Sequence, residues 1–275
     1  MRLIIEHRTG YSFSEPQARL VQLLRMTPGC HNGQNVVDWR IDVDCDARLK
    51  HGRDGFGNET QMLYVDGPIE HIGITVTGEV LTEDRAGMIA GAVETLPPHL
   101  YLRKTDFTTA DDGIAAFARE IDAGDGSRLS KIHRLNHELH EWITLDEGRR
   151  RGESTAASVF AEGHGAYTDL AHVFIAAARA IGFPARYVSG HLFRREEGAA
   201  LRETAHGWAE AHVDGMGWIG FDPAMGKCPD DAYVRVSIGL DYRDAAPLSG
   251  ARTGGGAEEL EVGVRVGLAD GQARQ

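Results

Sequence analysis

Residues 1–90 alternate between apolar and polar positions, which is the pattern of half-buried β-strands. The alternation is clear over residues 2–13 and 36–46, and in the second range one face collects Trp39, Ile41, Val43 and Cys45. A further strand is marked by Ile72, Ile74, Val76 and Val80. The Gly-Phe-Gly-Asn run at 55–58 has the composition of a turn between strands. We therefore predict a small antiparallel β sandwich over residues 1–90.

After the two prolines at 97–98 the apolar spacing changes to that of helices. Helices are predicted at 111–123 and about 128–143, and the first begins with acidic residues that suit the positive end of a helix dipole. These helices belong to a predicted α+β core over residues 91–235. A C-terminal β segment, residues 236–275, is expected to pack back on the body.

The most apolar part of the core is residues 163–190, which combine a Gly-rich turn, a helix that is apolar on nearly all sides, and a strand after Pro184. A loop that leads into a buried helix is a common position for a nucleophile, because free N–H groups and the positive dipole end lie there. In this chain Tyr167 and Thr168 occupy that position, and no cysteine does.

Two alternating runs within residues 204–223 predict a β-hairpin around a three-residue loop, Val213-Asp214-Gly215. In that register His206 lies directly opposite Asp222, so the two side chains share one face of the hairpin. A carboxylate in this position fixes the tautomer of an imidazole and stabilises its cation, as in the base half of a nucleophile–His–Asp system. A purely structural His–Asp hydrogen bond between strands is the alternative interpretation.

The charge of the chain argues against two classes of partner. The net charge is -12 and the isoelectric point is about 5.5, so we expect neither nucleic-acid binding nor attachment to an anionic membrane. No stretch resembles a transmembrane span or the apolar core of a signal peptide, and we predict a cytoplasmic protein. The oligomeric state is left open.

Neither a cofactor nor a metal site is predicted. The three cysteines are scattered and suit reduced thiols better than a disulfide or a zinc site. Several side chains could in principle surround one ion, but no compact ligand spacing such as HExxH joins them: His164, Tyr167, His172, His206, His212 and Asp222.

The order of these motifs resembles that of the bacterial transglutaminase-like proteins, which are thiol enzymes with a papain-like catalytic arrangement. The resemblance rests on the Gly-rich turn and helix, then PARYVSG, the His–Trp strand and GWIGFDP. It extends to IEHRTGYSFSEP and DGFGN near the beginning and to YVRVSIGLDYRDAAPLSG near the end. It implies an α+β fold, with a transglutaminase-like (papain-like) core behind an N-terminal antiparallel β sandwich.

The resemblance also implies roles for single residues. His206 matches the general base of the family and Asp222 its orienting carboxylate. Asp169 and His172 match the helix residues of a Cys-x-Asp-x-Ala-His run, and Tyr167 stands where the cysteine is expected. Two further departures accompany it, because Gly207 replaces a usual alanine and Ala224 a usual polar residue.

Without the cysteine, thiol chemistry is not expected. A thiolate forms readily at a helix N-terminus, whereas a phenol has a pKa near 10 and is a poor nucleophile toward amides. We therefore predict a non-catalytic or diverged protein that binds a peptide or amide-containing ligand in a cleft lined by Trp208, Trp218, Asp169 and His164.

Two other classes of function stay open. The chain could be an active amidase, peptidase or acyltransferase that uses another nucleophile, such as Cys228, or a metal-bound water. It could instead have a structural or assembly role through the β sandwich, with a cleft that has no function.

Overall fold

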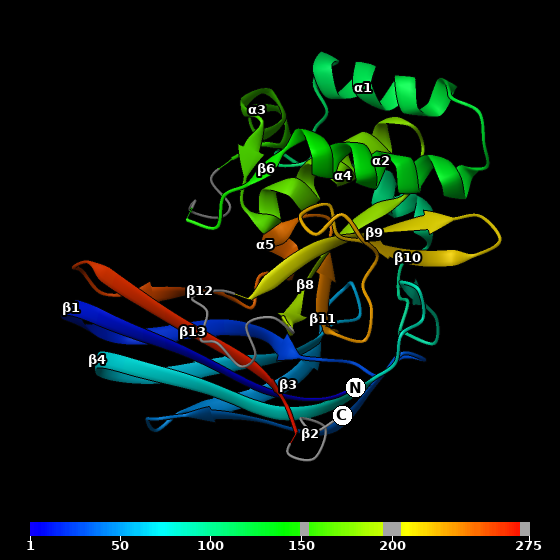
Figure 1. Ribbon diagram of the computed structural model, residues 1–275. Coiled ribbons are helices and arrows are strands. Elements are labelled where there is room, and N and C mark those ends of the chain that lie inside the picture. Colours follow the sequence, from blue (N-terminus) through cyan, green and yellow to red (C-terminus); the bar gives the residue numbers. More distant parts are fainter. Residues whose placement is uncertain (149–153, 195–204, 270–275) are drawn as a thin grey trace.

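The computed structural model describes residues 1–148, 154–194 and 205–269. Within these ranges the protein has two layers (Figure 1). The lower layer is a large antiparallel sheet, and the upper layer is a smaller sheet covered by helices. This confirms the predicted α+β class. None of the described helices has the length and apolar character needed to cross a membrane.

The lower layer, called here the N-terminal sheet, contains strands from both ends of the chain. Its members are β1 (Arg2–Thr27), β2 (Gln34–Val43), β3 (Arg48–Arg53), β4 (Glu59–Thr82), β12 (Leu248–Thr253) and β13 (Glu258–Leu268). Strand β1 pairs with β4 along most of its length, β2 and β3 pair with β4, and β12 and β13 pair with β1. The C-terminal strands therefore complete the sheet that the N-terminus begins.

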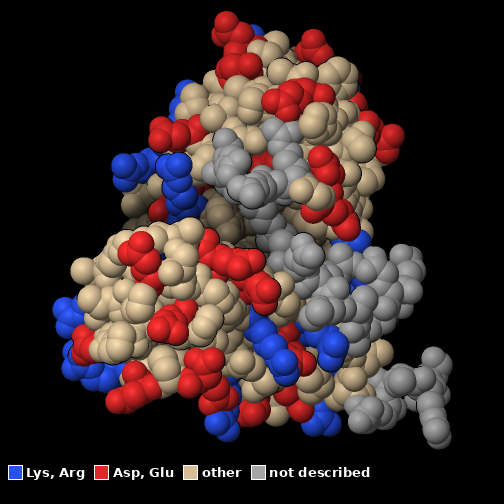
Figure 2. Space-filling model, turned by 90° about the vertical axis from the view of Figure 1, so that its left-hand side faces the viewer, with Lys and Arg blue, Asp and Glu red and all other residues tan. Residues whose placement is uncertain are grey.

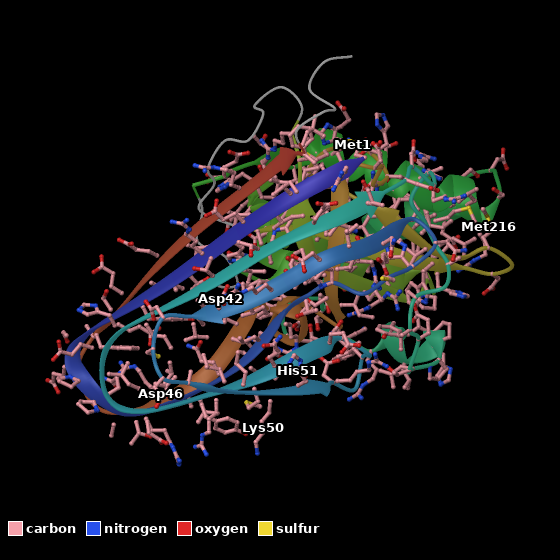
Figure 3. The ribbon with its side chains drawn as sticks, turned by 90° about the horizontal axis from the view of Figure 1, so that it is seen from below. Met1, Asp42, Asp46, Lys50, His51 and Met216 are labelled. Atoms are coloured by element: carbon pink, nitrogen blue, oxygen red, sulfur yellow. The ribbon has the colours of Figure 1, made fainter. Side chains whose placement is uncertain are left out.

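The predicted sandwich arises because this sheet folds over on itself. The pairing of β1 with β4 is irregular between Ser12 and Arg19, and irregularities of this kind bend a strand. Buried side chains from both halves of the two long strands then form one hydrophobic cluster, including Tyr11, Leu20, Leu63 and Ile74. Seen from below, the segment from Asp42 through Asp46 to Lys50 and His51 leads from β2 into β3 alongside the long strands (Figure 3).

The upper layer, called the core sheet, has the order β11-β8-β9-β10-β5. Its members are β5 (Met88–Ile89), β8 (Ala185–Leu192), β9 (His206–Val213), β10 (Gly217–Phe221) and β11 (Tyr233–Gly239). One face packs on the helices through Ala185, Tyr187, Ala209, Ala211 and Phe221. The other face packs on the N-terminal sheet through Val188, Trp208, Trp218 and Val234. The core sheet is thus buried on both faces.

The remaining elements surround one central helix, α4 (Tyr167–Ala180). They are the 3-10 helix η1 (Pro98–Leu102), α1 (Asp112–Ala123), α2 (Arg128–Trp142), α3 (Ala156–Glu162), α5 (Tyr242–Ala245) and the short paired strands β6 (Thr144–Leu145) and β7 (His164–Gly165). Every residue of α4 from Tyr167 to Arg179 is buried, as its all-round apolar sequence predicts. Helix α1 begins after Asp111, whose side chain accepts a hydrogen bond from the Ile114 N–H.

The β9–β10 hairpin is present, but its register differs from the prediction by two residues. Val213 pairs with Gly217 and His212 with Trp218, so the loop is formed by residues 214–216. The Met216 N–H closes the turn on the Val213 carbonyl, and Gly215 and Gly217 both take positive φ angles, which favour glycine. A shift by an even number of residues leaves each side chain on its predicted face. Thr204, at the start of the predicted segment, lies outside the described residues.

Candidate functional site

The centre of the site is a buried His–Asp pair at the open end of the hairpin. The Nε2 atom of His206, the first residue of β9, lies 2.6 Å from Oδ2 of Asp222, which follows β10. The exposed fractions of the two residues are 7% and 0%. The predicted contact is therefore present, although the backbone partner of His206 in the core sheet is Gly190. Asp222 reaches the imidazole diagonally across the hairpin.

The carboxylate of Asp222 is held by further donors. Its Oδ1 atom accepts from the N–H groups of Ala224 and Met225 at 3.0 and 3.2 Å, and its Oδ2 atom accepts from the Tyr233 hydroxyl at 2.8 Å. Burial, followed by the charge of Asp222, raises the pKa of Tyr233, so this phenol remains a donor. A carboxylate bonded in this way orients the imidazole that it contacts.

Tyr167 is the first residue of α4, and its ring forms a T-shaped pair with the imidazole of His206. The centroids of the Tyr167 and His206 rings are 4.6 Å apart and the ring planes meet at 66°. The phenol hydroxyl donates to Oε1 of Glu147 and accepts from Nη2 of Arg194. Within the described part of the chain, its hydrogen bonds are therefore made to these two charged groups and not to His206.

Of the two tryptophans predicted to line the pocket, only Trp208 lies beside the His206–Asp222 pair. The ring of Trp208 is stacked near His206, with centroids 6.0 Å apart. Trp218 does not flank the pair. The guanidinium of Arg186 lies 3.8 Å from the centroid of the Trp218 ring. Trp218 pairs with His212 across the hairpin. Trp218 lies at the turn end of β10, four residues before Asp222, and so away from the pair.

Asp169 and His164 do not line a common pocket. Asp169 is fully buried and its Oδ2 atom accepts from the Ala166 N–H at 3.0 Å, so it caps α4 from within. The side chain of His164 is 49% exposed and lies 3.8 Å from Glu162. Both were predicted to line the pocket; the structure places one beneath the surface and the other on it.

The remaining histidines do not join the pair either. His172 accepts a hydrogen bond from the Tyr242 N–H at 3.0 Å, and burial lowers its pKa to about 4, which keeps it neutral. His212 lies near the turn of the hairpin, as expected, and contacts Trp218. Among the described residues no group of three or more His, Cys, Asp or Glu side chains is arranged to hold a metal ion.

The cysteines lie in other surroundings. The Sγ atom of Cys228 is 4.0 Å from Nδ1 of His133 on α2, and burial raises the pKa of this thiol to about 11. Cys30 is exposed on the segment after β1, and Cys45 follows β2. A thiolate is therefore not favoured at Cys228 near neutral pH.

Three side chains at the site were not predicted: Tyr233, Glu147 and Arg194. Tyr233 begins β11, which is separated from β9 in the sheet by β8. Glu147 lies two residues after β6 and Arg194 two residues after β8, and both contact the Tyr167 hydroxyl at the beginning of α4. An aromatic residue opening a strand soon after the Asp-Pro turn is a weak signal for Tyr233, but nothing local indicates the other two.

Two family models match the chain, one for each layer. Residues 3–81 match the bacterial transglutaminase-like N-terminal region, and residues 115–223, which include Tyr167, His206 and Asp222, match the transglutaminase-like superfamily. The matched core, residues 115–223, belongs to the transglutaminase-like superfamily.

Relatives of this transglutaminase-like chain extend over nearly its full length. An uncharacterised protein of Mycobacterium leprae is 24% identical over 276 residues, covering 96% of this chain and 98% of the relative. One from Mycobacterium tuberculosis is 26% identical over 283 residues, covering 90% and 87%. A solved structure from Cytophaga hutchinsonii, described as a candidate cysteine protease, superposes with a TM-score of 0.78 at 19% identity and covers 98% of this chain and 91% of that one. This similarity supports the fold.

Proposed function

We propose that this transglutaminase-like protein binds a peptide or amide-containing ligand beside His206 and does not form a thioester with it. The observation that carries the proposal is the position of Tyr167. A phenol stands at the N-terminus of the buried helix and packs on the imidazole that Asp222 orients. The base half of a thiol site is thus kept without a thiol.

The hydrogen bonds of the phenol also support a non-catalytic role. A nucleophile is activated when an adjacent base accepts its proton. Here the Tyr167 hydroxyl is directed to Glu147 and Arg194, while its ring packs in a T-shaped arrangement against that of His206. The ring also occupies space beside the imidazole that an acyl group would need.

A surrogate thiol is not favoured. Cys228 contacts His133 on α2, and its pKa of about 11 leaves it protonated. The imidazole that could act as a base, His206, is hydrogen-bonded to Asp222, whereas the histidine beside Cys228 is His133.

The test is to restore the nucleophile with Tyr167→Cys in a Cys228→Ser background. We expect hydrolysis of generic glutamine and peptide substrates to rise by about a hundredfold or more above background, since a positioned base contributes about that much. This activity should be lost on alkylation and in the added His206→Ala variant. The parent should show binding without turnover.

One result would contradict the proposed binding role. Turnover by the parent that resists alkylation and disappears in His206→Ala would show that the chain is an enzyme with another nucleophile. In that case the proposed binding role would be wrong.

A further inference from the structure

We propose that Arg194 and Tyr167 form a binding site for a carboxylate group of the ligand, and that the side chain of Glu147 occupies this site when no ligand is present. The inference rests on the proposed function, because it names the chemistry of the ligand that binds beside His206.

The contacts around Glu147 are those of a bound carboxylate. Its Oε1 atom accepts from Nη2 of Arg194 at 2.9 Å and also from the Tyr167 hydroxyl. The same guanidinium nitrogen donates to the phenol oxygen. A cationic donor and a hydroxyl donor therefore converge on one carboxylate oxygen, which is the arrangement that recognises anionic oxygen most strongly.

The partners differ in how firmly they are held. The side chain of Arg194 is 16% exposed and its guanidinium lies 5.4 Å from the centroid of the Tyr167 ring, whereas the side chain of Glu147 is 52% exposed. Tyr167 itself is buried in the helical core. The donors are thus part of the packed body, and the acceptor is largely in solvent. A ligand carboxylate that displaces the half-exposed Glu147 side chain would therefore find both donors already in place.

The position of these donors connects them to the rest of the site. The Tyr167 ring that carries the hydroxyl also contacts the ring of His206. A carboxylate bound to Arg194 would therefore place the adjoining part of the ligand next to the imidazole. The net charge of the chain is -12, and Figure 2 shows both acidic and basic side chains on one face of the molecule. The overall charge therefore does not favour an anionic ligand, and the selectivity comes from the local donors.

The experiment compares two probes that differ only in charge: acetyl-Gly-Gln-Gly with a free C-terminal carboxylate, and the same peptide with a C-terminal amide. Binding is followed at pH 7 by NMR titration of the backbone amides at the start of α4 and β9. We expect the parent to prefer the carboxylate probe by roughly tenfold, the effect of a charge-assisted hydrogen bond in a partly exposed site.

Variants assign that preference to the two partners. Glu147→Gln removes the competing charge and should tighten binding of the carboxylate probe several-fold, with little effect on the amide. Arg194→Gln should abolish the preference, and Arg194→Lys should retain part of it because the charge remains without the planar fork. Arg19→Gln, at an exposed ion pair in the N-terminal sheet, is the control for net charge and should behave like the parent. Amide spectra of each variant verify folding.

The outcomes separate the two proposals. Equal binding of both probes by the parent and by Glu147→Gln, or a preference that survives Arg194→Gln, would overturn the carboxylate site and leave the proposed binding function intact. If neither probe shifts any resonance at the site in any variant, the binding function fails, and the carboxylate site fails with it.

Discussion

At the scale of single residues, the Asp222 carboxylate is the most constrained group of the site. It is fully buried and accepts from His206, Tyr233 and the backbone of residues 224 and 225. A buried carboxylate is costly unless hydrogen bonds replace its water. The two backbone donors come with the turn itself. Tyr233 is the donor that a single substitution can remove with little change of shape.

Tyr233→Phe should lower the free energy of unfolding by about 1.5–3 kcal/mol, the value of a hydrogen bond to a charged group. The ring would keep its edge contact with Trp208, at 5.3 Å between centroids, so packing loss contributes little. Urea denaturation measures the change. Tyr64→Phe, at a partly exposed tyrosine of β4, is the matched control and should stay within about 0.5 kcal/mol of the parent. Equal effects of the two substitutions would contradict this role of Tyr233.

Sequence reasoning found the His206–Asp222 contact because both residues belong to one local hairpin, and because an even error in register keeps side chains on the same face. The prediction that Trp218 lines the pocket is wrong, because this residue lies four positions before Asp222 on β10 and pairs with His212 near the turn. Sequence reasoning missed Glu147 and Arg194, which are 20 and 27 residues from Tyr167. Loop conformations set such contacts, and no periodic pattern encodes them.

At the scale of elements, strands β8 and β9 explain one departure from the family pattern. A Cβ atom on Gly207 of β9 would lie 1.9 Å from the hydroxyl oxygen of Tyr187 on β8 and 2.8 Å from its Cζ atom. That hydroxyl also lies 3.3 Å from Oγ1 of Thr168 in α4. The glycine that stands in place of the usual alanine is therefore a packing requirement of Tyr187, and loss of selection at the site is not needed to explain it.

Gly207→Ala should destabilise the protein by about 1–3 kcal/mol, because overpacking a buried position typically costs this much. The cost should fall by about 1 kcal/mol or more when the same change is made in a Tyr187→Phe background, since the closest atom is then absent. A double-mutant cycle by urea denaturation measures the coupling. Strictly additive effects would rule out the steric explanation. The control is Gly10→Ala in β1, where a new Cβ would meet nothing within 4 Å, and it should be nearly neutral.

The helices were predicted more closely than the long strands. Helices α1 and α2 carry their own boundary signals, as the caps at Asp111 and Ser127 show. Strand β1 continues to Thr27, well beyond the predicted range, because the exposed residues 14–16 interrupt its alternation where the sheet bends. The pairing of β12 and β13 with β1 joins segments more than 200 residues apart, and sequence spacing does not specify such partners.

At the scale of the whole molecule, the two layers meet across a mainly apolar interface that includes two buried histidines. Leu3, Ile5 and Val264 of the N-terminal sheet pack on Val188 and Val234 of the core sheet. Nearby, His7 of β1 and His191 of β8 have ring centroids 5.7 Å apart, edge to face. A small cavity beside them is lined also by Arg25, Ser189 and Ala205, the residue before His206. Neither histidine could be placed there from sequence, because the contact depends on how the layers dock.

This interface should make the fold sensitive to acid. Burial, together with the neighbouring His7, lowers the pKa of His191 to about 3, below its value of about 6.5 in an unfolded chain. A base whose folded pKa is lowered contributes stability in its neutral form, so this contribution is complete above pH 6.5 and is lost progressively as the pH falls toward 3. At pH 4 the loss from His191 alone is about 3 kcal/mol. Guanidinium denaturation at a series of pH values measures it.

The decisive comparison is the slope of stability against pH in His191→Phe. Phenylalanine keeps an aromatic ring against His7 but cannot take up a proton, so this variant should lose about 3 kcal/mol less than the parent between pH 7 and pH 4. The slope is the informative quantity, because an altered fit in the interface changes stability equally at both pH values. Val188→Ala alters the packing of the same interface without removing a titrating group, and should leave the slope of the parent unchanged. If His191→Phe and the parent show the same slope, protonation of His191 does not weaken the contact between the layers, and the acid sensitivity of the molecule arises elsewhere.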